Sequence, residues 1–518
     1  MQQFRVNNIK ELLTLLKDKK FIIWGAGAGG YIFFKSFCEK YKLYPLFVLD
    51  KKVEKEKKFL GIKAVNPYYY KLENLDKNLW IIITIKKEWI VRDIEKFLEE
   101  REFKNIIELE YDTWFELEKN FWEDLYKTTW KTKEKQKKHS KNYTINVLQN
   151  ITQKVCVIHI GMPKTGSTSI QISLSNFKND KFCYPKLDPL GNHSFPLAYI
   201  FMNYEEFIKV FNLFVKEKKE NFLEKQKFYL NQLRKACEND SSSLFILSGE
   251  AICKYFENNL KYIKNFFKKY FFEIKIIAYI REPYSYISSS FQEYIKNFCV
   301  ALKDLNTIYF QYQTFQKFFE VFGEKNVILK KFDSLKFPDG CVVKDFCQTL
   351  GIAIEEKRIV RANASLPKEA VNLIYILRKY FSKINFFPWQ IEYLLNDLLL
   401  ENILKDIALH KFKISKKLIK PIVEKHKDDI KWMEEKLGEP LINLEDLEKP
   451  EPDYVIKSEE DLLTIPEEVF ERLRDYTNYK LNKRKSIPQQ VAEMLLTILA
   501  ENFPDIKAQL EEKKGLIL

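Results

Sequence analysis

The stretch Val155-Cys-Val-Ile-His-Ile160 is followed by Gly161-Met-Pro-Lys-Thr-Gly-Ser-Thr168 and then by Ser169-Ile-Gln-Ile-Ser-Leu174. The apolar run predicts a buried strand, the glycine-bounded segment predicts a tight loop, and the third segment predicts a helix. Such a loop cradles an anion, because backbone N–H groups point at it and the helix dipole favours its charge. The stretch therefore predicts an α/β fold with a phosphate-binding loop.

The loop departs from that of nucleotide triphosphatases, which reads G-x-x-x-x-G-K-[ST]. Gly161 and Gly166 match the two glycines, but Ser167 stands at the lysine position and the lysine lies earlier, at Lys164. The loop suits a single 5′-phosphate that carries one further anionic group, and Lys164 can reach the bridging oxygen of the leaving group. A nucleotide kinase or triphosphatase is the alternative hypothesis.

A second anion site is predicted where the strand Ile274–Ile280 ends and Arg281-Glu-Pro-Tyr-Ser-Tyr-Ile-Ser-Ser289 begins. Ligands of open α/β sheets bind at the carboxyl ends of strands. Arg281 offers a planar fork of donors for a phosphate, and Ser289 adds a hydroxyl. The alternative is an arginine that pairs locally with Glu282.

Both segments resemble motifs of the sulfotransferases that use 3′-phosphoadenosine 5′-phosphosulfate (PAPS), especially the bacterial carbohydrate type. His159 to Gln171 resembles their 5′-phosphosulfate loop, Arg281 with Ser289 resembles their 3′-phosphate motif, and the resemblance covers about residues 154–445. It implies transfer of a sulfuryl group from PAPS to a hydroxyl of a bacterial surface carbohydrate or its precursor, with adenosine 3′,5′-bisphosphate as the product. The implied contacts of the 5′-phosphosulfate are Pro163, Lys164, Thr165, Gly166, Ser167 and Thr168.

A third segment, Arg361-Ala-Asn-Ala-Ser-Leu366, resembles the basic and polar loop that closes over the nucleotide in this family. Asn363 and Ser365 would be its polar contacts. A non-catalytic protein with a degenerate sulfotransferase fold, which binds a glycan or nucleotide, is a further alternative. The retained Lys164, Arg281 and Ser289 count against it.

Two residues are candidates for the general base that the acceptor hydroxyl requires. Glu250 follows the predicted strand Leu244–Leu247, at the same sheet edge as the phosphate loop. His193 lies in the predicted loop Gly191-Asn-His-Ser-Phe-Pro196, and histidine has a suitable ordinary pKa. We favour Glu250, because a strand end fixes the place of a side chain better than a loop does.

The N-terminal region contains Phe21-Ile-Ile-Trp-Gly25-Ala-Gly27-Ala-Gly-Gly30, and Asp50 ends the next predicted strand. This order of strand, G-x-G-x-x-G, helix and acid is the dinucleotide-binding pattern. It also resembles the small Rossmann-like domain of bacterial sugar-modifying enzymes, which can hold a nucleotide-sugar. The residues of such a site would be Gly25, Gly27, Gly30 and Asp50. Alternatively, the glycines only allow close packing of strand and helix.

The expected architecture is α/β with three parts. Residues 1–115 form a Rossmann-like domain, 151–445 a sulfotransferase domain with a parallel sheet, and 446–518 a helical C-terminal region, with 116–150 as a polar connector. Strands are expected at Phe21–Trp24, Leu46–Leu49, Trp80–Ile85 and Val327–Leu329, and helices at 29–41 and 88–100.

The bulk composition limits the partners of the chain. It has 518 residues and a formal net charge of +14, which suits an anionic partner such as a nucleotide, an acidic glycan or an anionic membrane face. No nucleic-acid-binding motif is evident, so a nucleic-acid partner is not expected. The eight cysteines form no C-x-x-C pair, and no run of 18 apolar residues occurs. We expect a cytoplasmic protein without a metal site or a transmembrane segment.

Overall fold

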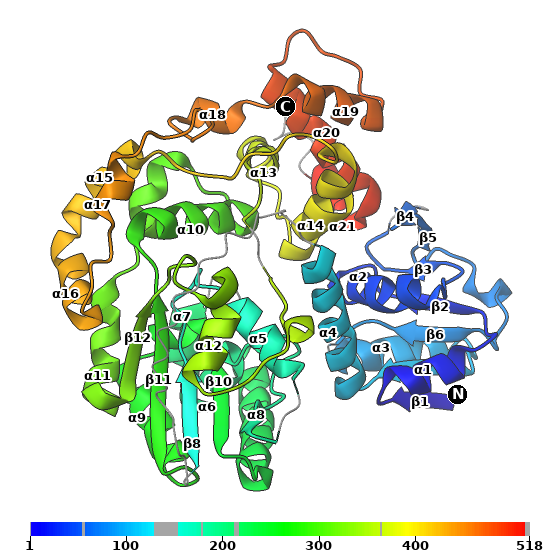
Figure 1. Cartoon of the computed structure of the whole chain (residues 1–518). Coiled ribbons are helices and arrows are strands. Elements are labelled where there is room, and N and C mark those ends of the chain that lie inside the picture. Colours follow the sequence, from blue (N-terminus) through cyan, green and yellow to red (C-terminus); the bar gives the residue numbers. More distant parts are fainter. Residues whose placement is uncertain are drawn as a thin grey trace.

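The computed structural model describes residues 2–53, 57–86, 88–128, 154–177, 180–211, 217–362 and 365–512. Figure 1 shows two units, each built on a sheet flanked by helices, with helices of the last third of the chain above and between them. The two sheets are separate and have seven and five strands. The expected α/β class is confirmed.

The sheet of the first unit has the strand order β1-β7-β6-β2-β3-β5-β4. Its strands are β1 (Gln2–Val6), β2 (Phe21–Trp24), β3 (Val48–Leu49), β4 (Lys57–Phe59), β5 (Ile62–Val65), β6 (Trp80–Ile83) and β7 (Asn105–Leu109). All neighbours run parallel except β4 and β5, which pair antiparallel. The strands expected from the sequence are confirmed as β2, β3 and β6, and β3 and β6 are shorter than expected.

The central strand β2 of this sheet is buried on both faces, as in helix-covered parallel sheets. Along β2, Phe21 and Ile23 belong to one apolar core, whereas Ile22 and Trp24 belong to another on the opposite face. The covering helices are α1 (Ile9–Leu16), α2 (Ala28–Phe33), α3 (Glu88–Glu99) and α4 (Tyr111–Thr128). A π-helical segment, Phe34–Glu39, extends α2, so the expected helix at 29–41 is confirmed in two parts.

The sheet of the second unit is parallel throughout and has the order β12-β11-β8-β10-β9. Its strands are β8 (Val155–His159), β9 (Phe182–Cys183), β10 (Leu244–Ser248), β11 (Glu273–Ile280) and β12 (Val327–Lys331). The central strand β8 is completely buried, because Cys156 and Ile158 face one core and Val155 and Val157 face the other. Four of these strands were expected, and the phosphate loop leaves the central one.

The helices of the second unit lie between and around these strands. They are α5 (Ser167–Ser175), α6 (Ser194–Phe201), α7 (Tyr204–Phe211), α8 (Lys219–Asn239), α9 (Glu257–Phe267), α10 (Pro283–Asn297), α11 (Gln316–Phe322), α12 (Val342–Thr349) and α13 (Lys368–Tyr380). The chain then continues as α14 (Pro388–Tyr393), α15 (Lys416–Lys425), α16 (Lys427–Leu437), α17 (Leu444–Glu448), α18 (Glu459–Leu463), α19 (Glu467–Thr477), α20 (Ile487–Asn502) and α21 (Pro504–Glu512).

The last third of the chain packs directly on the first unit. Tyr31 of α2 donates from its hydroxyl to Asp397 at 2.9 Å, and Lys35 forms an ion pair with the same carboxylate at 2.5 Å. The ring of Tyr31 lies 5.4 Å from that of Trp389 in α14. Helix α4 crosses the expected boundary at residue 115, because Leu117, beyond that boundary, is buried in the same core.

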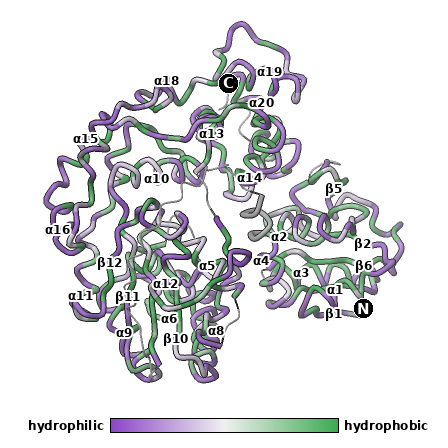
Figure 2. The backbone as a smooth tube through the Cα atoms, viewed as in Figure 1, coloured by the Kyte–Doolittle hydropathy of each residue, from purple (hydrophilic) through white to green (hydrophobic). Residues whose placement is uncertain are grey.

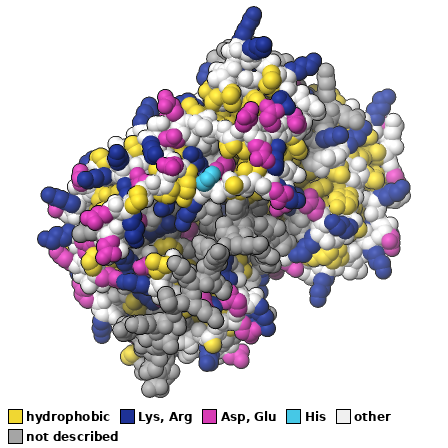
Figure 3. Space-filling model, turned by 45° about the horizontal axis from the view of Figure 1, so that its top comes forward, with side chains coloured by type: hydrophobic (Ala, Val, Ile, Leu, Met, Phe, Trp, Pro, Cys, Tyr) yellow, Lys and Arg dark blue, Asp and Glu magenta, His cyan; other side chains and the backbone are white. Residues whose placement is uncertain are grey.

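The chain is basic, with a formal net charge of +14. Figure 2 shows hydrophobic residues along the strands and hydrophilic residues on many outer turns and loops. In Figure 3, Lys and Arg side chains are scattered over the visible face among Asp and Glu side chains. None of the helices in the described ranges is long and apolar enough to cross a lipid bilayer.

Candidate active site

The phosphate loop connects β8 to α5, and its backbone fixes where glycine is required. Gly161 and Gly166 have φ of +88° and +77°. A Cβ atom at Gly161 would lie 2.9 Å from the Cβ of Glu250, and one at Gly166 would lie 2.7 Å from a methyl of Val342. Both positions therefore need glycine for its conformation and its size. Lys164 also has a positive φ, +67°, which is uncommon for a residue with a side chain.

The loop and the start of α5 offer hydrogen-bond donors. The hydroxyl of Ser167 is buried at the first position of α5 and finds no hydrogen-bond partner among the described residues. A buried hydroxyl without a partner costs free energy, so an acceptor that reaches it is favoured. Thr165 has a different role, because its hydroxyl donates to the Met162 carbonyl at 2.6 Å within the loop. The arrangement can bind an anion at the positive end of the helix dipole.

Arg281 follows β11 and reaches the phosphate loop. Its Nη1 donates to the Lys164 carbonyl at 2.6 Å and its Nε donates to the Ser285 hydroxyl at 3.0 Å. The carboxylate of Glu282 caps α10 by accepting from the backbone N–H of Tyr284 and Ser285. The two motifs, more than a hundred residues apart in sequence, therefore meet at the carboxyl edge of the sheet.

Helix α10 carries Ser285, Ser289 and Glu293 at intervals of four residues, which places them on one face. Ser289 is half-buried. Lys164 Nζ donates to Glu293 Oε2 at 3.2 Å, and Asn297 donates to Glu293 Oε1 at 2.7 Å. The Lys164 ammonium is the main cause that lowers the pKa of Glu293 to about 2. Glu293 was not among the residues predicted from the sequence; its spacing of four from Ser289 was the available signal.

Glu250 stands beside the phosphate loop, directly after β10. Its Oε2 accepts from the Gln171 amide at 2.8 Å and its Oε1 accepts from the Asn192 amide at 3.1 Å. Gln171 belongs to α5, so the same helix that begins at the phosphate loop orients this carboxylate. A carboxylate held by two neutral amides keeps lone pairs for a further proton or hydroxyl.

His193 is completely buried and both of its ring nitrogens are occupied by the backbone. Nε2 lies 2.9 Å from the Pro185 carbonyl, and Nδ1 accepts from the Ser248 N–H at 3.1 Å. A carbonyl only accepts, so Nε2 carries the proton and the ring is neutral. Burial lowers the pKa of His193 to about 4. Neither nitrogen is available to a substrate in this arrangement.

The segment before α13 lies along α5. The Val360 N–H donates to the Ser173 hydroxyl and the Ala362 N–H donates to the Ser169 hydroxyl, both at 2.9 Å. Arg361 pairs with Glu356 at 2.6 Å rather than with the phosphate loop. Asn363 lies outside the described residues, and Ser365 is exposed.

The glycine segment of the first unit is shaped mainly by packing. A Cβ atom at Gly30 would lie 2.1 Å from the Gly25 carbonyl oxygen, and Gly25 has φ of +123°. Asp50 accepts at 2.7 Å from the Ala26 N–H, so the acid binds the loop itself. A Cβ atom at Gly27 would meet open space. Of the three glycines, only Gly27 has no packing contact that requires it.

Comparison with known proteins finds limited similarity. No family model matches the chain. An uncharacterised protein of Archaeoglobus fulgidus is 26% identical over 116 residues, which are 22% of this chain and 32% of that protein. The chain thus spans about a third of the length of that relative.

Three solved structures are also similar to this chain. A sulfotransferase from Alicyclobacillus acidocaldarius has 12% identity and a TM-score of 0.29, over 57% of this chain and 98% of that one. The sulfotransferase domain from the curacin biosynthetic pathway has 16% identity and a TM-score of 0.24, over 40% and 77%. The sulfotransferase domain from the Synechococcus PCC 7002 olefin synthase has 14% identity and a TM-score of 0.25, over 53% of this chain and 94% of that one. Neither a donor nor an acceptor for this chain follows from similarity at this level.

Proposed function

We propose that the chain is a sulfotransferase that moves a sulfuryl group from PAPS to a hydroxyl group, with a bacterial surface carbohydrate or its precursor as the acceptor. The observation that carries the proposal is the hydrogen bond from the Arg281 guanidinium to the Lys164 carbonyl. It joins a loop suited to a phosphosulfate to an arginine suited to a second phosphate. A nucleotide with two separated anionic groups fits that pairing better than one with a single polyphosphate chain.

The donor would be held by the loop backbone, the Ser167 hydroxyl, Arg281 and Ser289. When bound, PAPS supplies the sulfuryl group and a bisphosphate leaving group. Ser167 would give its unpartnered hydroxyl to the 5′-phosphosulfate. Arg281 and Ser289 would contact the 3′-phosphate from the face of α10.

Lys164 would leave Glu293 and stabilise the charge that develops on the leaving oxygen. Glu250 would accept the acceptor's hydroxyl proton as the new oxygen–sulfur bond forms and the bond from sulfur to the bridging oxygen breaks. His193 would shape the loop before α6, since both of its nitrogens are occupied. We therefore assign the base to Glu250.

Nucleotide recognition tests the donor. Adenosine 3′,5′-bisphosphate should raise the melting temperature more than AMP or ATP with magnesium does. Arg281→Gln should remove the advantage over AMP, because a hydrogen bond to a charged group contributes about 1.5–3 kcal/mol. Arg484 is exposed, so Arg484→Gln is the control and should still be stabilised more by the bisphosphate than by AMP. Equal stabilisation of the wild-type protein by AMP and the bisphosphate would refute the donor assignment.

Turnover tests the base. With PAPS and an accepted sugar, Glu250→Gln should keep the bisphosphate affinity and lower turnover by about 100-fold or more. Glu257→Gln, at the start of α9, is a matched control that should leave turnover unchanged. Full turnover in a folded Glu250→Gln protein would eliminate Glu250 as the base.

A further inference from the structure

A cavity of about 610 Å³ lies where α10 ends, between the segment 298–303 and helix α13. Leu418 of α15 and Glu459 of α18 also line it. Its wall is mostly apolar, and the apolar residues are Ile295, Phe298, Val300, Ala301, Leu302 and Leu418. A concave, mostly apolar site with a few polar groups is the usual form of a small-molecule site.

The cavity wall carries more positive than negative charges. Glu459 accepts from the Tyr375 hydroxyl and pairs with Lys379 at 2.7 Å, so its charge is already compensated. Lys303 and Arg378 add two further positive charges. With one carboxylate against three cations, the wall is net positive and favours an anionic ligand.

Arg378 is the unusual member of the set, because it is buried with only 7% of its surface exposed. Its Nη2 donates to the Lys296 carbonyl at 2.5 Å, but its Nε is buried and has no hydrogen-bond partner in the described part of the chain. No described carboxylate pairs with the guanidinium, and burial lowers its pKa to about 10. A buried charge without a counter-charge is costly, and an anion supplied by a ligand would offset that cost.

We propose that this cavity binds a small amphipathic anion, whose aromatic or aliphatic body lies on the apolar wall and whose carboxylate, sulfate or phosphate pairs with Arg378. The cavity's volume of about 610 Å³ lies in the usual range of small-molecule sites. The inference does not rest on the proposed function, because none of the lining residues belongs to the phosphate loop or to the Arg281 motif.

The test compares 2-naphthyl phosphate, 2-naphthoate and the neutral 2-naphthol by isothermal titration calorimetry on the full chain. Both anions should bind at least about tenfold more tightly than the neutral compound. Whichever anion binds more tightly identifies the class of the acidic group. Equal affinity of the neutral compound, or no binding of either anion at millimolar concentration, would overturn the proposal.

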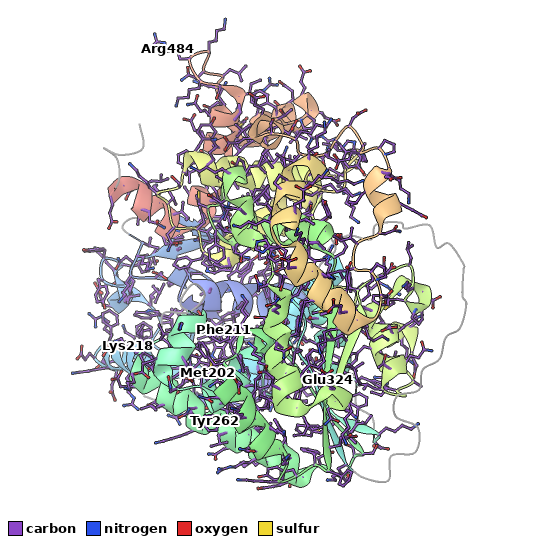
Figure 4. The ribbon with its side chains drawn as sticks, turned by 90° about the vertical axis from the view of Figure 1, so that its left-hand side faces the viewer. Met202, Phe211, Lys218, Tyr262, Glu324 and Arg484 are labelled. Carbon is purple, nitrogen blue, oxygen red and sulfur yellow. The ribbon has the colours of Figure 1, made fainter. Side chains whose placement is uncertain are left out.

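Three arginine variants locate the bound probe. Arg378→Gln should lose about tenfold or more in affinity for the anions. Arg484→Gln should bind as the wild type does, because Arg484 is exposed at the top of the molecule in Figure 4 and does not line the cavity. Arg281→Gln should also retain binding. If Arg281→Gln lost binding of the anions and Arg378→Gln retained it, the probe would be assigned to the phosphate loop and the proposal would be overturned.

A second route avoids the buried charge in case Arg378→Gln does not fold. Ser382 is exposed on the cavity wall, so Ser382→Trp should fill the cavity without removing a charge. It should abolish binding of both anions and leave the melting temperature of the free protein unchanged. Retained binding in a folded Ser382→Trp protein would contradict the proposed site.

Discussion

The burial of His193 predicts how the protein responds to acid. Its pKa of about 4, against an ordinary value of 6.5, is a gap of about 2.5 pH units. At about 1.36 kcal/mol per unit, the gap corresponds to about 3 kcal/mol of unfolding free energy. Protonation would place a second N–H on the ring, against the Ser248 N–H from which Nδ1 now accepts.

The sign of the effect follows from which state takes up the proton. Between about pH 6.5 and pH 4 the unfolded chain binds a proton at this histidine and the folded chain does not, so the free energy of unfolding falls as the pH falls. The contribution is complete above about pH 6.5 and is lost near pH 4. Only about 2 kcal/mol of it falls between pH 7 and pH 5, which is a practical window.

The assay is urea denaturation of the wild type and of His193→Asn at pH 7, 6 and 5, with unfolding monitored by circular dichroism. His159 is also buried, and its pKa is lowered to about 3, but it is present in both proteins and cancels in the difference. The stability advantage of the wild type should shrink by about 2 kcal/mol over this window. If the difference in unfolding free energy between the two proteins did not change with pH, or if NMR gave a titration midpoint near pH 6.5 for His193, the hydrogen bonds to both ring nitrogens would be refuted. His193 would then return to the candidates for the base.

Two further predictions concern a glycine of the phosphate loop and the contact between the C-terminal helices and the first unit. Gly166→Ala should lower the free energy of unfolding by about 2–4 kcal/mol, through left-handed strain and the contact at 2.7 Å, measured by urea denaturation. Gly438→Ala, with φ of +73° and open space around its Cβ position, is the control and should cost only about 1 kcal/mol; equal costs would contradict the contact. Asp397→Asn should destabilise the protein by about 2–3 kcal/mol in calorimetry, because Tyr31 and Lys35 both lose a charged partner. A change below 0.5 kcal/mol, the usual range of a surface substitution, would contradict this.

Local sequence was sufficient where one strand and its following loop carry the information. The run from Val155 to Ile160 is apolar at every position but one, so it predicts a strand buried on both faces. The Arg281 motif also follows its strand directly. Because parallel strands present their carboxyl ends at one edge, the meeting of the two motifs was predictable in outline.

Contacts between distant segments were not predictable in this way. The partner of Lys164 is Glu293, and a helical glutamate gives no sign of which cation faces it. The fixed ring of His193 depends on Pro185 and Ser248, which come from different elements. The polar composition after residue 115 suggested a connector, yet Leu117 and Phe121 continue the buried stripe of α4.

The contact between the C-terminal helices and the first unit also has a consequence during synthesis. Tyr31 and Asp397 are 366 residues apart in the chain. At about 5–20 residues per second, the ribosome needs about 20–70 s to supply the partner after the tyrosine has been made. Throughout that interval the face of α2 that will meet Trp389 and Tyr393 is open to other chains. Slow translation of the middle of the message would prolong the exposure of this face.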